Sequence, residues 1–358
     1  MASAAAAAIL AVGAATVLIL GTGRGERGGD VVVPPIPPAT EATTDTATSI
    51  EAPTLWTEAH LATSGDVTLA WNADGIWRYS EGAWTRFADA PPGAFDLAYT
   101  AEALWAIAES GVSYLDPEGW HPFDEAPPDT YRIAGDPVAD VLWLSTGEDL
   151  YRWDGTSMSM AGHLPNGNGP VGADIGYVGD IVVTGDGSVW ASGLFGWMPW
   201  TAGMARYDTR TGAWEAVRPL GGTDDIPATE MAPTPDGDLW VVLADWFEDW
   251  EARAAANEPV AVLSLARYVE EAGQWLVFEY PSEGYPGAIA SGGDSIWLTR
   301  GASVAGGTPL PGVAYFDGER WATYLEDLPV DDTVAALTVA ADGTIWYSGN
   351  GEIRQLVP

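Results

Sequence analysis

Short segments in which hydrophobic and polar positions alternate recur along most of this chain. Residues 134–160 give an example, since the segments LWLS and DLYRW are separated by turns rich in Gly, Asp and Thr. Alternation at period two predicts β-strands, and segments of four to six residues between turn signals predict antiparallel hairpins. The pattern therefore predicts an all-β chain assembled from units of four short strands.

A tryptophan motif, Asp-Gly-x-Leu-Trp in its fullest form, divides the chain into these units. Its tryptophan falls at seven positions: Trp71, Trp105, Trp143, Trp190, Trp240, Trp297 and Trp346. The steps between them are 34, 38, 47, 50, 57 and 49 residues, which is the range of one propeller blade. A second aromatic anchor, typically Gly-x-Trp, follows at Trp84, Trp120, Trp214, Trp275 and Trp321. We predict a seven-bladed β-propeller over residues 54–358 with both tryptophan sets in its core; a six-bladed ring is the alternative.

The Asp-Gly pairs between the segments are typical of hairpin turns. They occur at Asp74-Gly75, Asp154-Gly155, Asp186-Gly187, Asp236-Gly237, Asp317-Gly318 and Asp342-Gly343. Gly accepts a positive φ and Asp can accept hydrogen bonds from its own turn. We therefore interpret these aspartates as turn residues and not as calcium ligands.

The last unit is one strand short. Residues 334–358 end after a third strand, whereas TLWTEA at residues 54–59 matches the outer-strand pattern with Trp56 as its anchor. An N-terminal strand added to the last blade would close the ring and cover its open edge. We predict closure of this kind.

The N-terminal 53 residues differ in composition from the repeats. Residues 1–23 are uncharged and long enough to span a bilayer as a single-pass anchor, with a cleaved signal segment as the alternative. Residues 24–53 are rich in Pro and Thr and predict a disordered linker. Arg24 and Arg27 follow the apolar segment, which by the positive-inside rule favours a cytoplasmic propeller. We expect the propeller at the cell membrane on the extracytoplasmic side, and its orientation stays open.

Charge limits the class of partner. The chain has 51 acidic residues against 14 basic ones, all of them arginine, which gives a net charge of −37. Nucleic acid is excluded as a partner because binding to phosphates requires a basic surface. For the same reason we expect membrane contact through the N-terminal helix only. The chain has no cysteine, so thiolate chemistry and disulfides are excluded.

Unequal loops indicate where a ligand would bind. The connections between the second and third strands lengthen in the fourth, fifth and sixth units, and in a propeller they share a face with the loops between blades. The candidate aromatic residues are Phe195, Trp197, Trp200, Trp246, Phe247 and Trp250. The candidate carboxylates are Asp224, Asp225, Glu230, Asp331 and Asp332, with Asp174 and Asp180 nearby. Exposed aromatic clusters favour a protein, peptide, glycan or cationic ligand, and a self-packed lid is the alternative.

Catalytic motifs are missing from the chain. The three histidines, His60, His121 and His163, lie in different units, and no nucleophile elbow, P-loop or His-Glu-x-x-His motif occurs. We predict no cofactor, although carboxylates at the mouth of the central channel could bind Ca²⁺ or Mg²⁺. A binding module is therefore favoured, and a lyase or hydrolase that uses these carboxylates is the alternative.

The rhythm of DGIWRYSEGAWTRF and EDLYRWDG resembles the two-component-regulator propeller repeat of periplasmic sensor domains in bacterial hybrid histidine kinases. The resemblance implies ligand sensing or binding outside the cytoplasm. More distantly, the Asp-Gly-x-Trp turns are similar to those of the virginiamycin-B-lyase propellers. No catalytic residue is carried over from that family.

Overall fold

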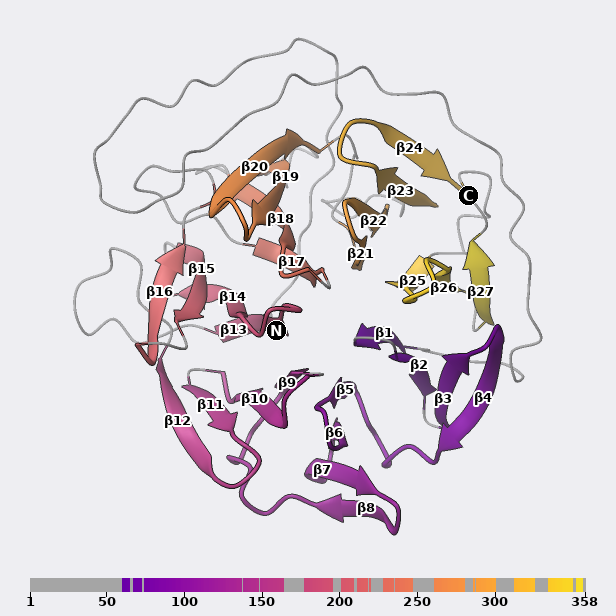
Figure 1. Ribbon diagram of the computed structural model, residues 1–358, viewed down its shortest axis with the longest axis vertical. Coiled ribbons are helices and arrows are strands. Elements are labelled where there is room, and N and C mark those ends of the chain that lie inside the picture. The colour runs from indigo at the N-terminus through magenta and orange to yellow at the C-terminus, as the bar shows by residue number, and fades with distance from the viewer. Residues whose placement is uncertain are drawn as a thin grey trace, which may run out of the picture.

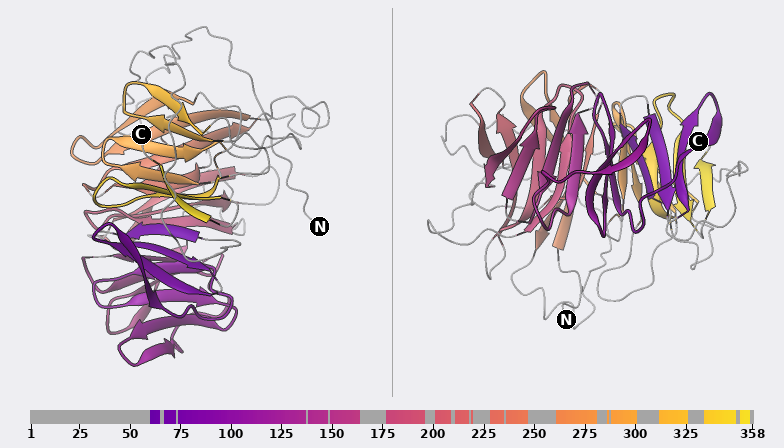
Figure 2. Two further views of the ribbon diagram at one scale, coloured as in Figure 1. Left: turned by 90° about the vertical axis from the view of Figure 1, so that its right-hand side faces the viewer. Right: turned by 90° about the horizontal axis from the view of Figure 1, so that it is seen from below.

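The computed structural model describes most of residues 60–356, with longer gaps at 164–176, 196–200, 220–227, 247–260, 281–285, 301–311 and 326–333. Its strands form seven separate antiparallel sheets, arranged as blades around a central axis (Figure 1). Seen edge-on, the blades stand side by side, and their strands run between the two faces of the ring (Figure 2). The prediction of a seven-bladed β-propeller is confirmed, and the six-bladed alternative is wrong.

Strand bounds follow the repeat units closely. Blade 1 contains β1 (His60–Ser64), β2 (Val67–Asn72), β3 (Gly75–Ser80) and β4 (Ala83–Ala88). Blade 2 contains β5 (Asp96–Tyr99), β6 (Leu104–Ala108), β7 (Gly111–Asp116) and β8 (Gly119–Pro122). Blade 3 contains β9 (Arg132–Asp136), β10 (Val141–Ser145), β11 (Asp149–Trp153) and β12 (Met158–His163). Blade 4 contains β13 (Tyr177–Val183), β14 (Val189–Phe195), β15 (Thr201–Asp208) and β16 (Ala213–Val217).

The remaining blades complete the ring. Blade 5 contains β17 (Ala228–Pro233), β18 (Leu239–Trp246), β19 (Ala261–Val269) and β20 (Gln274–Glu279). Blade 6 contains β21 (Ile289–Gly292), β22 (Ser295–Thr299), β23 (Val313–Phe316) and β24 (Trp321–Tyr324). Blade 7 contains β25 (Val334–Val339), β26 (Ile345–Gly349) and β27 (Glu352–Leu356). The sheet of blade 7 has three strands within the described residues, and the predicted closing strand around Trp56 lies outside them.

The predicted anchor, residues 1–23, and the predicted linker, residues 24–53, also lie outside the described residues. Within the described part of the chain, no helix is long and apolar enough to cross a membrane.

Adjacent blades are joined by aromatic contacts between their sheets. Trp190 on β14 of blade 4 packs edge-on against Tyr268 and Trp275 of blade 5, with ring centroids 5.0 and 5.9 Å apart. Trp346 of blade 7 meets Tyr79 and Trp84 of blade 1 in the same way, at 4.8 and 5.2 Å. Edge-to-face geometry at these distances is the favoured arrangement for aromatic pairs. The same interlock therefore joins neighbours along the chain and joins the last blade to the first.

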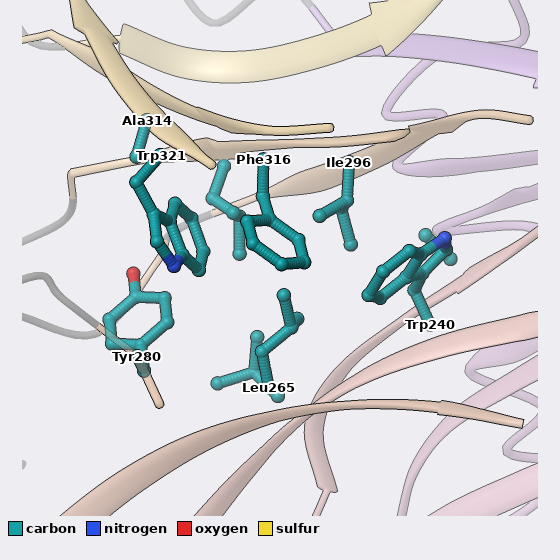
Figure 3. Packing of buried hydrophobic residues seen from close by; sticks show 10 residues of the cluster. Trp240, Leu265, Tyr280, Ile296, Ala314, Phe316 and Trp321 are labelled. Carbon is teal, nitrogen blue, oxygen red and sulfur yellow. The ribbon is translucent and has the colours of Figure 1, made fainter. Parts of the chain in front are cut away.

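The tryptophan repeat is thus a repeat of core positions. All seven first-set tryptophans are buried, and so are Trp275 and Trp321 of the second set, which confirms their predicted core role. Trp84, Trp120 and Trp214 are half-buried. Figure 3 shows the cluster between blades 5 and 6, where Trp240 lies near Phe316, and Phe316 near Trp321.

Blade 1 departs from the predicted alignment of the first tryptophans. In blades 3, 4 and 5 the first tryptophan pairs with an arginine of the third strand, as Trp143 does with Arg152. In blade 1 the residue that pairs with the equivalent arginine, Arg78, is Leu69. Trp71 lies two residues later on the same side of the strand, so it is buried but not equivalent to the other six.

The Asp-Gly pairs form turns, as predicted. The Asp186 carboxylate accepts hydrogen bonds from the Ser188 backbone N–H (3.0 Å) and the Thr184 hydroxyl (2.5 Å), and Gly187 has a φ of 80°. In the first blade the roles differ, since the Asn72 side chain accepts the hydrogen bond from the Asp74 N–H at 2.8 Å.

We expect Trp190→Ala to destabilise the protein by about 3–5 kcal/mol, because it leaves a cavity at a blade interface where two aromatic partners lose contact. Urea-induced unfolding measures this loss. Trp120→Ala, at a half-buried position, is the control and should cost less; equal losses would contradict an interlock centred on the first tryptophan.

Candidate functional site

The inner strands of the seven blades present equivalent positions around the axis (Figure 1). In each blade one inner-strand residue pairs with the core residue at the first-tryptophan position; examples are Ala98 with Trp105 and Ala134 with Trp143. Two residues before this paired residue, and nearer the start of the inner strand, lies a second position; in blade 2, for example, Asp96 lies two residues before Ala98. These seven earlier residues, which we call the axial ring, are His60, Asp96, Arg132, Asp180, Glu230, Ala288 and Ala336. Four consecutive blades thus contribute a charged side chain at the same level.

Alternation along the inner strands directs the ring residues toward the next blade. The residue after each charged position packs into the preceding blade: Leu97 contacts the core of blade 1, and Ile133 that of blade 2. Successive side chains point to opposite faces of a strand. Accordingly, the Asp96 carboxylate accepts a hydrogen bond from the Ile133 N–H of blade 3 at 3.2 Å. All four charged residues are half-buried.

β-Bulges precede two of the charged positions. The pairing of β13 with β14 shifts between Val178 and Asp180, and that of β17 with β18 shifts between Ala228 and Glu230. A bulge removes one residue from the ladder and reorients the side chain that follows it. The Arg132 Nε donates to the carbonyl oxygen of Gly179, the extra residue in β13, at 3.1 Å. Blade 3 is therefore joined to the bulge of blade 4 at the level of the ring.

The three carboxyl groups of the ring hold protons unusually tightly. Burial raises the pKa of Asp96 to about 7 and that of Asp180 to about 6, against the opposing effect of the Arg132 charge. Burial and, to a smaller extent, the negative charge of Asp180 raise the pKa of Glu230 to about 8, against the lowering effect of Arg132. Desolvation and like charge are the two physical causes. The groups therefore act on one another electrostatically across the blades.

Direct pairing does not neutralise this cluster. Among the described residues, no ion pair within 4.0 Å joins Arg132 to any of the three carboxyl groups. The arginine donates instead to the backbone carbonyls of Gly179 and Tyr131. In the described part of the chain Glu230 accepts no hydrogen bond. Polar groups that the protein leaves unmatched in this way can serve a ligand.

The extended hairpins of blades 4 and 5 end at the same face as the ring. We call this the upper face: it is where each inner strand begins and where the second strand turns into the third. Phe195 pairs with Thr201 at the end of β14, and Trp246 pairs with Ala261 at the end of β18. The hairpin of blade 1, by contrast, turns directly between Asn72 and Gly75. The predicted inequality of these connections is confirmed.

The structure places some of the predicted site residues. Glu230 and Asp180 lie in the axial ring, and Phe195 and Trp246 end two strands at the upper face. The others lie outside the described residues: Trp197, Trp200, Phe247, Trp250, Asp174, Asp224, Asp225, Asp331 and Asp332.

Sequence reasoning missed Asp96 and Arg132. A local signal for them exists: each charged ring residue is followed by one large apolar residue and then by Ala or Val, and Asp96 and Arg132 each open their strand. The four segments are Asp96-Leu97-Ala98, Arg132-Ile133-Ala134, Asp180-Ile181-Val182 and Glu230-Met231-Ala232.

In the described part of the chain, neither a metal centre nor the depression on blade 2 competes with the ring. No group of three or more Asp, Glu or His side chains among the described residues is arranged to hold a metal ion. An open depression of about 1550 Å³ lies on blade 2, where its lining includes Trp120, Phe123 and Glu102 but none of the axial ring. The ring is therefore a separate site, and its charged groups make it the stronger candidate.

Comparison with known proteins supports the fold. No family model and no curated protein matches the sequence. Virginiamycin B lyase from Staphylococcus aureus has a similar structure, with a TM-score of 0.58 and 14% identity over 87% of this chain and 99% of that one. The extracellular domain of a hybrid two-component system from B. thetaiotaomicron has a TM-score of 0.55 and 11% identity over 86% of this chain and 39% of that one. The structure of YCF48 bound to D1 peptide is similar with a TM-score of 0.56 and 14% identity, over 90% of this chain and 97% of that one. Both resemblances expected from the repeat are therefore confirmed, and they establish the propeller fold.

The raised pKa of Glu230 predicts how stability depends on pH. The folded protein holds this proton more tightly than the unfolded chain, so Glu230 makes stability fall as pH rises from its ordinary pKa of 4.5 through about 8. Glu230→Gln removes that loss. We expect the variant to match the wild type near pH ~5 and to exceed it by roughly 1–3 kcal/mol near pH ~9, each pKa unit being worth about 1.4 kcal/mol.

Urea unfolding at the two pH values measures this difference. Glu109→Gln is the matched control, because Glu109 is an exposed carboxylate between β6 and β7 on the same face. If Glu230→Gln and the wild type lose stability in parallel as pH rises, the carboxyl group is not buried as described.

Proposed function

We propose that this chain is a membrane-tethered, extracytoplasmic binding module whose ligand lies over the axial ring and contacts the loops of blades 4–6. The observation that carries the proposal is the axial ring itself. Asp96, Arg132, Asp180 and Glu230 come from four consecutive blades, act on one another electrostatically and form no direct ion pair in the described part of the chain.

The fold does not require charge at these positions. Blades 6 and 7 carry Ala288 and Ala336 at the equivalent level and form the same sheets. Desolvating a carboxyl group without a partner is costly, so charges that the blade does not need reduce stability. Groups retained at such a cost, at the end of a rigid scaffold, are typical of binding sites.

The loops of blades 4–6 would extend this site outward from the axis. We propose that Phe195, Trp197, Trp200, Trp246, Phe247 and Trp250 contribute apolar contacts, with the carboxylates Asp224, Asp225, Asp331 and Asp332 beside them. An aromatic and acidic surface suits a peptide, protein or glycan. Support by analogy comes from two similar folds, the extracellular domain of a two-component system and YCF48 bound to D1 peptide.

A ligand screen with site variants tests the proposal. Compounds, glycans and peptides that raise the melting temperature of the wild type are retested on Asp180→Asn, Arg132→Met and Trp246→Ala. We expect each variant to weaken binding by at least about tenfold, the loss of a charge-assisted hydrogen bond or a buried anchor being worth more than 1.4 kcal/mol. Trp197→Ala should act as Trp246→Ala does, with little change in melting temperature. Glu109→Gln should bind normally. Ligands that bind all variants equally would place the site elsewhere.

A lyase or hydrolase is the second candidate. One observation favours it: Asp96 and Glu230 have pKa values of about 7 and 8, a range suited to general acid catalysis. The same screen separates the two functions. A ligand recovered from the wild type with a bond broken, but recovered intact from Glu230→Gln, would favour the enzyme over the binding module.

Tethering is tested in cells of the source organism. We expect the full chain to sediment with membranes and the propeller to be cleaved when protease is added to spheroplasts without lysis. Removal of residues 1–23 should release the protein from the membrane fraction. Protection of the propeller until lysis would instead support a cytoplasmic domain, the orientation that Arg24 and Arg27 favour.

A further inference from the structure

We propose that the axial ring binds its ligand through a primary ammonium or guanidinium group seated between Asp180 and Glu230. This inference rests on the proposed binding function and specifies the chemistry of the ligand. It depends on the order of charges around the ring, on the lack of a hydrogen-bond partner for Glu230 among the described residues, and on the absence of a metal site among the same residues.

Charges alternate along part of the ring and then stop alternating. Asp96 of blade 2 is followed by Arg132 of blade 3 and then by Asp180 of blade 4, so the one ring arginine lies between two carboxyl groups. Blade 5 then contributes Glu230 directly after Asp180. No basic side chain separates these two acids in the ring. The position at which a positive charge would continue the alternation is the interface between blades 4 and 5.

Of the two acids, Glu230 accepts fewer hydrogen bonds from the described residues. The Asp180 carboxylate accepts a hydrogen bond from the Ile181 N–H at 2.8 Å, whereas Glu230 accepts none among the described residues. Glu230 is also half-buried and is repelled by the charge of Asp180, so its pKa of about 8 keeps it mostly protonated at neutral pH. A cation at this position would supply the favourable interaction that the proton now supplies. Binding should therefore release a proton.

No ring position other than the four charged ones carries a permanent charge. Ala288 and Ala336 follow Glu230 around the ring and are uncharged, and His60 of blade 1 stacks on Trp71 at 5.1 Å. Arg132 opposes the negative charge of all three acids but forms no ion pair with any of them within the described chain. An anionic ligand would meet three carboxyl groups for one arginine. The net charge of −37 also attracts cations to the protein as a whole.

The cation we infer is organic and not a metal ion. Ca²⁺ takes six to eight oxygen ligands, and among the described residues no cluster of three or more carboxylates or histidines can hold an ion. Two neighbouring carboxyl groups are enough for an ammonium or guanidinium group, because its N–H groups form directional, charge-assisted hydrogen bonds.

Isothermal titration calorimetry with matched probe pairs tests the inference. The first pair is 1,4-diaminobutane and 1,4-butanediol, and the second is N-acetyl-lysine N-methylamide and N-acetyl-norleucine N-methylamide. The pairs distinguish a free amine from a side chain carried on a peptide, and tighter binding in either supports the inference. We expect at least one cationic probe to bind at least tenfold more tightly than its neutral analogue. Titration near pH ~7.5 in phosphate and in HEPES should show release of a proton.

Site variants provide the controls. Glu230→Gln and Asp180→Asn should each reduce the affinity for the cationic probe at least tenfold, and Glu230→Gln should also abolish proton release. Glu109→Gln, which removes one charge from the same face outside the ring, should leave both unchanged. A cooperative thermal transition at or above the melting temperature of the wild type shows that each variant has folded, and the proton count gives a readout that a merely destabilised protein would not change.

Two outcomes would overturn the inference. In one, the neutral analogues bind as tightly as the cations, or the cations bind Glu230→Gln unchanged. In the other, no cationic probe binds, while uncharged ligands from the screen lose affinity in Arg132→Met; the cation is then wrong and the binding function stands. If the ring variants affect neither the probes nor the screen ligands, both proposals fail.

Discussion

The packing of each blade's buried aromatic residue on the next blade is the constraint on which the rest of this structure depends. A single four-stranded sheet cannot bury both of its faces, so each blade requires its neighbours. Trp190 covers the third and fourth strands of blade 5, and Trp346 does the same for blade 1. Because the last blade contacts the first through the same interlock, the ring leaves no blade with an uncovered face.

Closure of the ring determines what the inner strands can carry. Their apolar residues, such as Leu97 and Ile133, belong to the cores between blades. The ring positions lie near the start of each inner strand and differ from blade to blade, as the change from Glu230 to Ala288 and Ala336 shows. The aromatic interlock fixes the blades, and the bulges before Asp180 and Glu230 then set the level of their side chains. The residues of the axial ring therefore differ from blade to blade, whereas the packing that holds the blades together is repeated.

The sequence predicts the frame well and the site only in part, for a physical reason. Core tryptophans repeat because every blade solves the same packing problem, so their spacing counts the blades correctly. Even there, the register places Leu69 and not Trp71 at the equivalent position, because two apolar residues on one face of a strand satisfy the same pattern. Glu230 was predicted as a member of an acidic loop surface. Asp96 and Arg132 were not predicted, because no pattern in one blade reveals a partner contributed by another.

The number of residues between each ring residue and the core tryptophan of its blade also explains why Asp96 and Arg132 were not predicted. Asp96 precedes Trp105 by 9 residues, Arg132 precedes Trp143 by 11, and Asp180 precedes Trp190 by 10. The turn between the first two strands differs in length from blade to blade, so a fixed spacing does not align these charges. Strand pairing does align them. It locates each ring residue relative to the inner-strand residue that pairs with the core tryptophan, and not by its distance along the chain. The short segment that follows each charge is similar in the four blades, but only the register shows that the charges share one level in the fold.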